Sequence, residues 1–262
     1  MNKAFFDIVK LFVKRELIDK SKEDVLGVLW ILLQPFVFIF MYIVIFSHFF
    51  GTKLAGDQYS DKYSYSIHLI SGLLLWQLNA NIIQNMSTVF VYNANIIKKI
   101  PINLLAISLY IPIIELIYFF ISMFIFLVFL WFINYFPPLS VLIMLLPVLF
   151  FQILFSYSIG LIVAIFTIFI KDTIKILNIL LQVVFWSLPI VYPFSILPNY
   201  LQNILEKNPF FPFVRIMQEI FLNHGFENLF KNLVLISTLS LLLLFLAILI
   251  FNRFKKFIRD IL

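Results

Sequence analysis

The hydrophobic pattern of the chain consists of six long apolar runs separated by short polar stretches. Because a helix rises about 1.5 Å per residue, roughly 20 apolar residues cross a hydrocarbon core of about 30 Å. Apolar and polar residues do not alternate along the runs, as they would in the strands of a membrane β-barrel. The pattern therefore predicts an all-α membrane protein with six transmembrane helices. The predicted spans are residues 25–50, 67–91, 104–133, 141–170, 174–196 and 233–251.

The first 24 residues have the pattern of an amphipathic helix rather than that of a signal peptide. They contain six Lys/Arg and five Asp/Glu residues, and their apolar side chains share one face of a helical wheel. A helix of this kind lies in the membrane interface. Residues 1–24 are therefore predicted to form a cytoplasmic interface helix, either as a plain anchor or as a docking element for a partner. Residues 25–262 are predicted to form the transmembrane domain.

The segment between the fifth and sixth spans, residues 197–225, is rich in proline and too short to cross the membrane. Two short helices, over residues 199–207 and 213–223, fit its pattern. Irregular backbone at membrane depth is tolerated where protein shields it or where it lines a cavity. The segment is therefore predicted to be either an extracytoplasmic re-entrant gate or a structured external loop.

Composition and charge narrow the class of protein. Hydrophobic residues make up 63% of the chain and charged residues 12%, which excludes a water-soluble enzyme and a disordered chain. The chain has no cysteine, so disulfides and thiol catalysis are excluded. With a cytoplasmic N-terminus, 14 Lys/Arg residues fall inside and 5 outside, which predicts that both termini are cytoplasmic. The net charge of +6 is then an orientation signal that requires no nucleic acid.

Candidate chemistry along the chain is sparse. There is no G-x-x-x-x-G-K-[ST] motif, and the three histidines lack metal-ligand spacing. We therefore expect no catalytic site, metal or cofactor on the chain itself. Glu115 is the only carboxylate inside the six runs, and it is either a buried structural partner or a translocation residue, because an intramembrane charge is costly. Trp30 and Tyr92 are either interfacial anchors or contacts for a sugar or lipid headgroup.

Four sequence motifs follow one another along the predicted helices. LGVLWILLQP begins at Leu26, NANIIKK at Asn93, GLIVAIFTIFIKD at Gly160, and SLPIVYPFSILP at Ser187, with NPFFPF following from Asn208. In this order and on a six-helix frame, they resemble the motifs of the membrane subunit of ABC-2 type transporters that export O-antigen, capsule or teichoic acid polysaccharides. The resemblance covers nearly the whole chain.

The resemblance implies an ATP-driven exporter of a lipid-linked polysaccharide in the bacterial inner membrane. Two copies of the chain would pair around a path, and each would bind a separate P-loop ATPase subunit that carries ATP and Mg²⁺. The implied ATPase-coupling residues are Lys10, Lys14, Arg15, Asn93, Asn95, Lys98, Lys99 and Pro101. The candidate gate residues are Tyr192, Pro193, Pro198, Tyr200, Asn208 and Pro209. Trp30, Tyr92 and Glu115 are the candidate contacts along the path or at a headgroup.

Other classes of membrane protein are expected to have different sequence features. An ABC-2 type exporter of a small lipophilic compound often carries a large external domain, whereas the external segments here are short. A secondary transporter or channel without an ATPase should show internal repeats or several intramembrane charges. A membrane-embedded transferase would need a His or Asp constellation at the membrane surface. The polysaccharide exporter is the function that the sequence favours.

Overall fold

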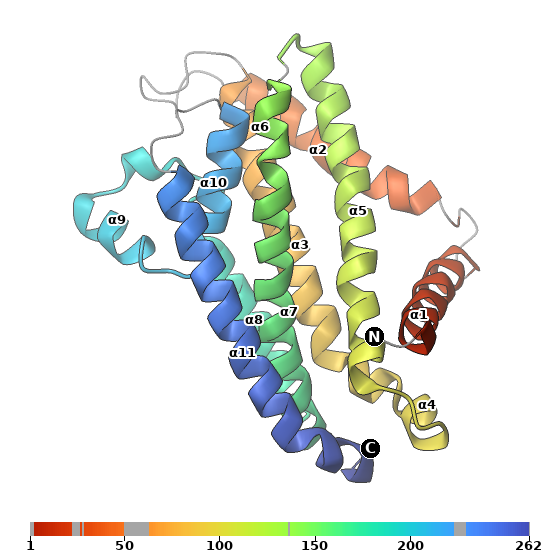
Figure 1. Cartoon of the computed structure of the whole chain (residues 1–262). Coiled ribbons are helices and arrows are strands. Elements are labelled where there is room, and N and C mark those ends of the chain that lie inside the picture. Colours follow the sequence, from red (N-terminus) through yellow and green to blue (C-terminus); the bar gives the residue numbers. More distant parts are fainter. Residues whose placement is uncertain are drawn as a thin grey trace.

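The computed structural model describes residues 3–22, 27, 29–49, 63–135, 137–222 and 229–261. Within these ranges the chain forms helices and short connections, with no β-strand, which confirms the predicted all-α class (Figure 1). The helices are α1 (Lys3–Lys22), α2 (Leu29–Phe49), α3 (Ser64–Tyr92), α4 (Ala94–Lys99), α5 (Leu104–Phe132), α6 (Leu139–Ile143), α7 (Leu145–Phe169), α8 (Thr173–Ser187), the 3-10 helix η1 (Phe194–Ile196), α9 (Asn199–Leu205), α10 (Phe211–Leu222) and α11 (Leu229–Ile261).

Four helices in the described part of the chain are long and apolar enough to cross a membrane: α3, α5, α7 and α11. The other two predicted spans correspond to α2, which has 21 residues, and to the shorter apolar helix α8, which has 15. The count of six spans therefore stays a prediction. Parts of the predicted interface helix, first span and gate segment, at residues 1–2, 23–26, 28, 50 and 223–225, lie outside the described residues.

The largest differences between the helix boundaries and the predicted ones occur at three places. The fourth run is divided at Met144 into α6 and α7. The fifth run is not one helix over residues 174–196, because α8 ends at Ser187. Leu188 has extended backbone angles, φ −92° and ψ 143°, since a residue that precedes a proline is driven out of the helical region. The sixth run continues without a break into the basic tail, so α11 extends to Ile261.

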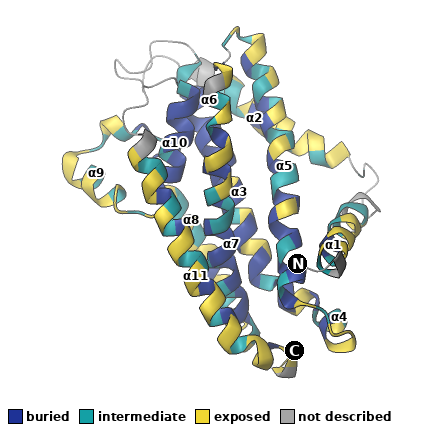
Figure 2. Ribbon diagram, viewed as in Figure 1, coloured by how far each residue is buried: buried dark blue, intermediate teal, exposed yellow. Residues whose placement is uncertain are grey.

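Helix α3 forms the centre of the fold. It packs against α7, α10 and α5, while α11 packs against the other side of α7. Buried residues are concentrated on α3, α7 and α10, and exposed residues line α9 and α11 (Figure 2). Polar contacts also join the helices: Ser156 of α7 donates a hydrogen bond to Asn79 of α3, and Ser108 of α5 lies 2.7 Å from the Tyr157 hydroxyl of α7.

The closest approach of α3 and α7 depends on Gly160. A Cβ atom at this position would lie 2.5 Å from Met86 Cβ and 3.4 Å from Ile83 Cα. Both of these atoms are held by the α3 backbone, so neither can rotate away. The missing side chain is what allows the two helices to pack at this distance, as small residues do between membrane helices.

Gly160→Ala is therefore expected to destabilise the protein by about 1–3 kcal/mol, the usual cost of overpacking a well-filled core. The measurement is thermal unfolding of the purified protein in detergent, with the amount of membrane-inserted protein as a second readout. An unchanged midpoint of unfolding would contradict the close contact between α3 and α7.

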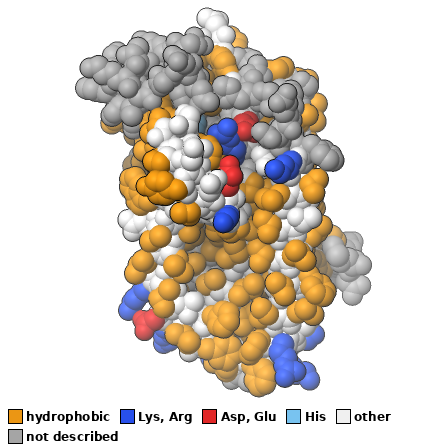
Figure 3. All heavy atoms as spheres, turned by 90° about the vertical axis from the view of Figure 1, so that its left-hand side faces the viewer, with side chains coloured by type: hydrophobic (Ala, Val, Ile, Leu, Met, Phe, Trp, Pro, Cys, Tyr) orange, Lys and Arg blue, Asp and Glu red, His pale blue; other side chains and the backbone are white. Residues whose placement is uncertain are grey.

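The outer surface has the distribution of side chains expected of a membrane protein. Figure 3 shows a broad region of hydrophobic side chains across the middle of one face, with charged side chains nearer its two ends. Along α11 the exposed side chains include Leu242, Phe245 and Leu249. Such a continuous apolar surface is stable only against lipid or another protein.

Candidate functional site

Helix α1, helix α4 and the end of α11 gather at one end of the fold (Figure 1). The ring of Phe12 on α1 stacks on Tyr110, near the start of α5, with 5.5 Å between the ring centroids. Arg259 on α11 donates a hydrogen bond of 2.8 Å to the carbonyl of Ile102, which links α4 to α5. Segments that are far apart in the sequence are thus joined to the start of α5 and to a residue that precedes it.

The predicted coupling residues on α1 lie on its outer side. Val9 and Phe12 are buried toward the rest of the fold, whereas Lys10, Lys14 and Arg15 are exposed. Arg15 forms an ion pair with Asp19 one turn further along α1, with 3.3 Å between Nε and Oδ2. The helix therefore presents a basic face away from its apolar contact with α5.

Helix α4 has one buried anchor and an exposed polar side. Asn93 separates α3 from α4, and its Nδ2 donates to the carbonyl of Val89 at 2.9 Å. Ile97 is the buried residue of α4. Ile97 faces the rest of the fold. Because α4 has only six residues, the other predicted coupling residues lie on its other side and face outward. The exposed residues are Asn95, Lys98, Lys99 and, just after the helix, Pro101.

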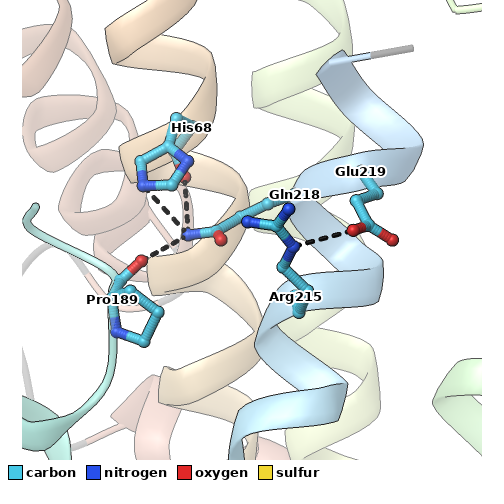
Figure 4. A network of polar contacts seen from close by, with 5 residues as sticks. All are labelled: His68, Pro189, Arg215, Gln218 and Glu219. Carbon is cyan, nitrogen blue, oxygen red and sulfur yellow. Dashed lines mark hydrogen bonds and ion pairs between the residues drawn. The ribbon is translucent and has the colours of Figure 1, made fainter. Parts of the chain in front are cut away.

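At the opposite end of the fold, polar contacts of the Gln218 side chain connect α10 to α3 (Figure 4). Gln218 is 2% exposed. Its Nε2 donates to the carbonyl of Pro189 at 2.9 Å and lies 3.3 Å from His68 Nε2. A Cβ atom on Gly72 would lie 2.8 Å from this same nitrogen. One side chain thereby ties together α3, α10 and the segment that follows α8.

The predicted gate residues all belong to the segment between α8 and α10, and they have two kinds of environment. Asn208 accepts a hydrogen bond from Phe210 N at 3.0 Å, and its Nδ2 donates to Ser187 Oγ at 3.1 Å. The Tyr192 hydroxyl donates to the carbonyl of Trp186 at 3.2 Å. These two residues therefore hold the segment against the end of α8. Pro193 is buried, while Pro198, Tyr200 and Pro209 are exposed.

A cavity of about 530 Å³ lies between α2, α3 and α5. Glu115 lines this cavity and is only 5% exposed. Its Oε1 accepts a hydrogen bond of 2.8 Å from Asn85 Nδ2 on α3. Trp30 of α2 lines the same cavity, so two of the three predicted path residues meet there. Tyr92, at the end of α3, is 68% exposed and is not among the lining residues.

The sequence interpretation missed a row of amides on α3. Gln77, Asn81 and Asn85 all line the cavity, and their spacing of four residues places them on one face of the helix. Gln34 joins them from α2, and Ser122 from α5. The signal was present in the sequence, because amides that recur every four residues inside an apolar run mark a polar face of a membrane helix.

A second, smaller polar patch lies between α3 and α8. Gln84 Nε2 donates to Asn178 Oδ1 at 3.1 Å, and both residues line a groove of about 250 Å³ together with Gln182. All three side chains are exposed on the single chain. Amide groups that face hydrocarbon lose the hydrogen bonds of water, so this patch requires a polar or protein neighbour.

Comparisons with known proteins agree on one family. A sequence profile described as ABC-2 type transporter matches residues 8–222. Two curated proteins of Klebsiella pneumoniae, both described as O-antigen export system permease protein RfbA, are 26% and 24% identical to the chain over 257 residues. Each alignment covers 98% of this chain and 95% of the relative. The similarity thus includes α4, the cavity and the segment around Gln218.

Proposed function

Because the chain belongs to the ABC-2 type transporter family, whose membrane permeases work with a separate ATPase subunit, we propose that it exports a lipid-linked cell-surface polysaccharide. The observation that carries this proposal is the similarity to O-antigen export permeases over 98% of the chain. A cavity lined by amides and a carboxylate within apolar helices supports it, because a glycan presents many hydroxyl groups that need hydrogen-bond partners.

The proposed assembly contains two copies of this chain and two ATPase subunits, which bind ATP and Mg²⁺. It lies in the bacterial inner membrane, with both termini of this chain in the cytoplasm. The exposed patch of Gln84, Asn178 and Gln182 supports the pairing of two copies, because a second chain would shield these amides from lipid. Any path for the glycan then runs between the two copies.

The ATPase subunits dock, in this proposal, on the surface formed by α1 and α4. Lys10, Lys14 and Arg15 contribute a basic face that suits both anionic headgroups and an acidic partner surface. Helix α4 connects α3 directly to α5. A force on the exposed Lys98 and Lys99 therefore acts on two of the three helices that line the cavity, α3 and α5, and the binding of nucleotide can shift the membrane helices between two arrangements.

The gate, in this proposal, is the proline-rich segment from α8 to α10. Its six candidate residues lie in the same segment as Pro189, whose carbonyl accepts a hydrogen bond from Gln218. The hydrogen bonds of Asn208 and Tyr192 to the end of α8 support a segment that moves as a unit with α8. A gate of this kind opens when the contacts of Gln218 with Pro189 and His68 break together.

Deletion of the gene tests the proposed function. The expected result is loss of the polysaccharide from the cell surface and accumulation of its lipid-linked form inside the cell, because synthesis continues without export. Labelling intact and permeabilised cells with an antibody or lectin against the glycan distinguishes the two pools, and the gene on a plasmid restores the surface signal. Unchanged surface glycan in the deletion strain would contradict the proposal.

A further inference from the structure

We propose that the cavity between α2, α3 and α5 is a saccharide-binding subsite in which Glu115 is the decisive hydrogen-bond acceptor. The inference rests on the proposed function and gives the exported glycan a binding site within a single chain. The cavity volume of about 530 Å³ falls within the range of small-molecule sites, about 300–1,000 Å³. Three helices contribute to its lining.

The polar lining matches the hydrogen-bonding needs of sugar hydroxyls. A hydroxyl both donates and accepts, a carboxylate only accepts, and an amide side chain does both. Glu115 provides the acceptor, and amides from α2 and α3 provide donors and further acceptors. The polar lining residues are Gln34, Tyr42, Gln77, Asn81, Asn85, Glu115, Tyr118 and Ser122. An alkyl chain in this space would leave these groups without solvent or a polar ligand, at a cost in free energy.

Trp30 completes the chemistry of a sugar site. It lines the cavity on the α2 side and is 48% exposed, so part of its ring can contact a ligand. An aromatic ring offers a large apolar face that suits the C–H face of a sugar ring. The combination of one aromatic face, several amides and a carboxylate therefore favours a saccharide over a lipid tail.

A bare metal ion suits the cavity less well than a sugar does. Glu115 is the only carboxylate among the lining residues, and hard cations take six or more oxygen ligands, usually with several carboxylates. The described residues contain no group of three or more His, Cys, Asp or Glu side chains that could hold a metal. A single carboxylate that is hydrogen-bonded to an amide is instead suited to accepting hydrogen bonds from hydroxyl groups.

The chain contains no cysteine, so one introduced thiol reports on the cavity alone. We choose Ser122→Cys, which lines the cavity, and Phe124→Cys as its control. Phe124 lies two residues further along α5, at nearly the same depth, is 67% exposed and does not line the cavity. A charged, membrane-impermeant thiosulfonate reagent modifies a thiol in water but not one that faces lipid.

In cells, S122C is expected to react and F124C to remain unmodified. When the cells synthesise the glycan, modification of S122C should slow about threefold relative to cells with blocked synthesis, which corresponds to a site filled about two thirds of the time. Absence of reaction at S122C both in cells and in inverted membrane vesicles would overturn the proposal, since the cavity would then be closed to water from either side. Equal rates with and without glycan synthesis would also overturn it, since no saccharide would occupy the cavity.

Glu115→Gln tests the acceptor itself. The new amide oxygen can still accept from Asn85 Nδ2, so the variant keeps the contact between α3 and α5 while replacing the other carboxyl oxygen by an NH2 group. Export is expected to fall about tenfold, because that group can no longer accept a hydrogen bond from a sugar hydroxyl. Protection of S122C by the glycan should be lost in the S122C/E115Q double variant, with unchanged protein level.

Normal export by E115Q together with normal protection in S122C/E115Q would overturn the role of Glu115. The outcomes separate this proposal from the proposed function. If gene deletion abolishes surface glycan while S122C is never protected, the chain is an exporter without this subsite. If deletion leaves the surface glycan unchanged, the proposed function itself fails.

Discussion

The double variant Lys98→Glu/Lys99→Glu should remain in the membrane and lose export, while the associated ATPase continues to hydrolyse ATP. Both lysines are exposed on α4, whereas Ile97 is buried and the partly buried Ile96 packs against the core. Reversal of two charges at a contact surface replaces attraction by repulsion, whereas the basic face of α1 still holds the partner. We expect export to fall by at least about tenfold, a loss of roughly 1.4 kcal/mol of coupling between the sites.

The matched control is Lys255→Glu/Lys256→Glu. These two adjacent lysines are also exposed and lie near the same end of the fold, on α11. Both double variants replace two lysines at the same end of the fold by glutamates. Any effect of the lost positive charge on membrane orientation is therefore the same in both. Export is measured as surface glycan per cell, and hydrolysis as phosphate release by the purified complex. Normal export by the α4 variant, or equal loss in both variants, would show that α4 is not the coupling element.

The apolar pattern was sufficient to predict where α5 begins. The predicted third span and α5 both start at residue 104, because the side chain of Asn103 accepts a hydrogen bond from Leu105 N at 3.0 Å and caps the helix. The end of α8 shows the opposite case. From hydropathy alone, the fifth span was predicted to continue through Pro189, although a helix usually ends one or two residues before a proline. Backbone chemistry decided this boundary against the apolar pattern.

The candidate site was only partly accessible from the sequence. Glu115 could be singled out because a carboxylate in an apolar run is unusual. Its neighbours in the cavity could not be identified from the sequence. Gln34, Asn85 and Ser122 come from three different helices, and the hydropathy pattern does not determine how one helix is rotated relative to another. The same limit applies to Gln218, whose partners His68 and Pro189 are far away in sequence. Such contacts are fixed by tertiary packing.

Pairing of two copies through the α8 side of the chain should be detectable by cross-linking in a protein that has no native cysteine. Along α8, Ile179, Val183 and Trp186 are exposed and follow one another at helical spacing. They lie beside the amides Asn178 and Gln182, which need shielding from lipid. A disulfide forms only where two Cα atoms come within about 7 Å of each other. Single-cysteine variants at the three apolar positions are therefore expected to give an oxidised dimer at one or more of them.

The control positions are Leu242, Phe245 and Leu249 on α11. They are also exposed and also spaced along one helical face, but apolar residues there suit contact with lipid without any partner. Oxidation in native membranes followed by non-reducing electrophoresis measures the yield of dimer at all six positions. Dimer confined to α8 would support the two-copy path, because the amides of α3 and α8 would then lie at the interface. Equal yields on α8 and α11, or none on α8, would exclude this arrangement and require the glycan to pass elsewhere.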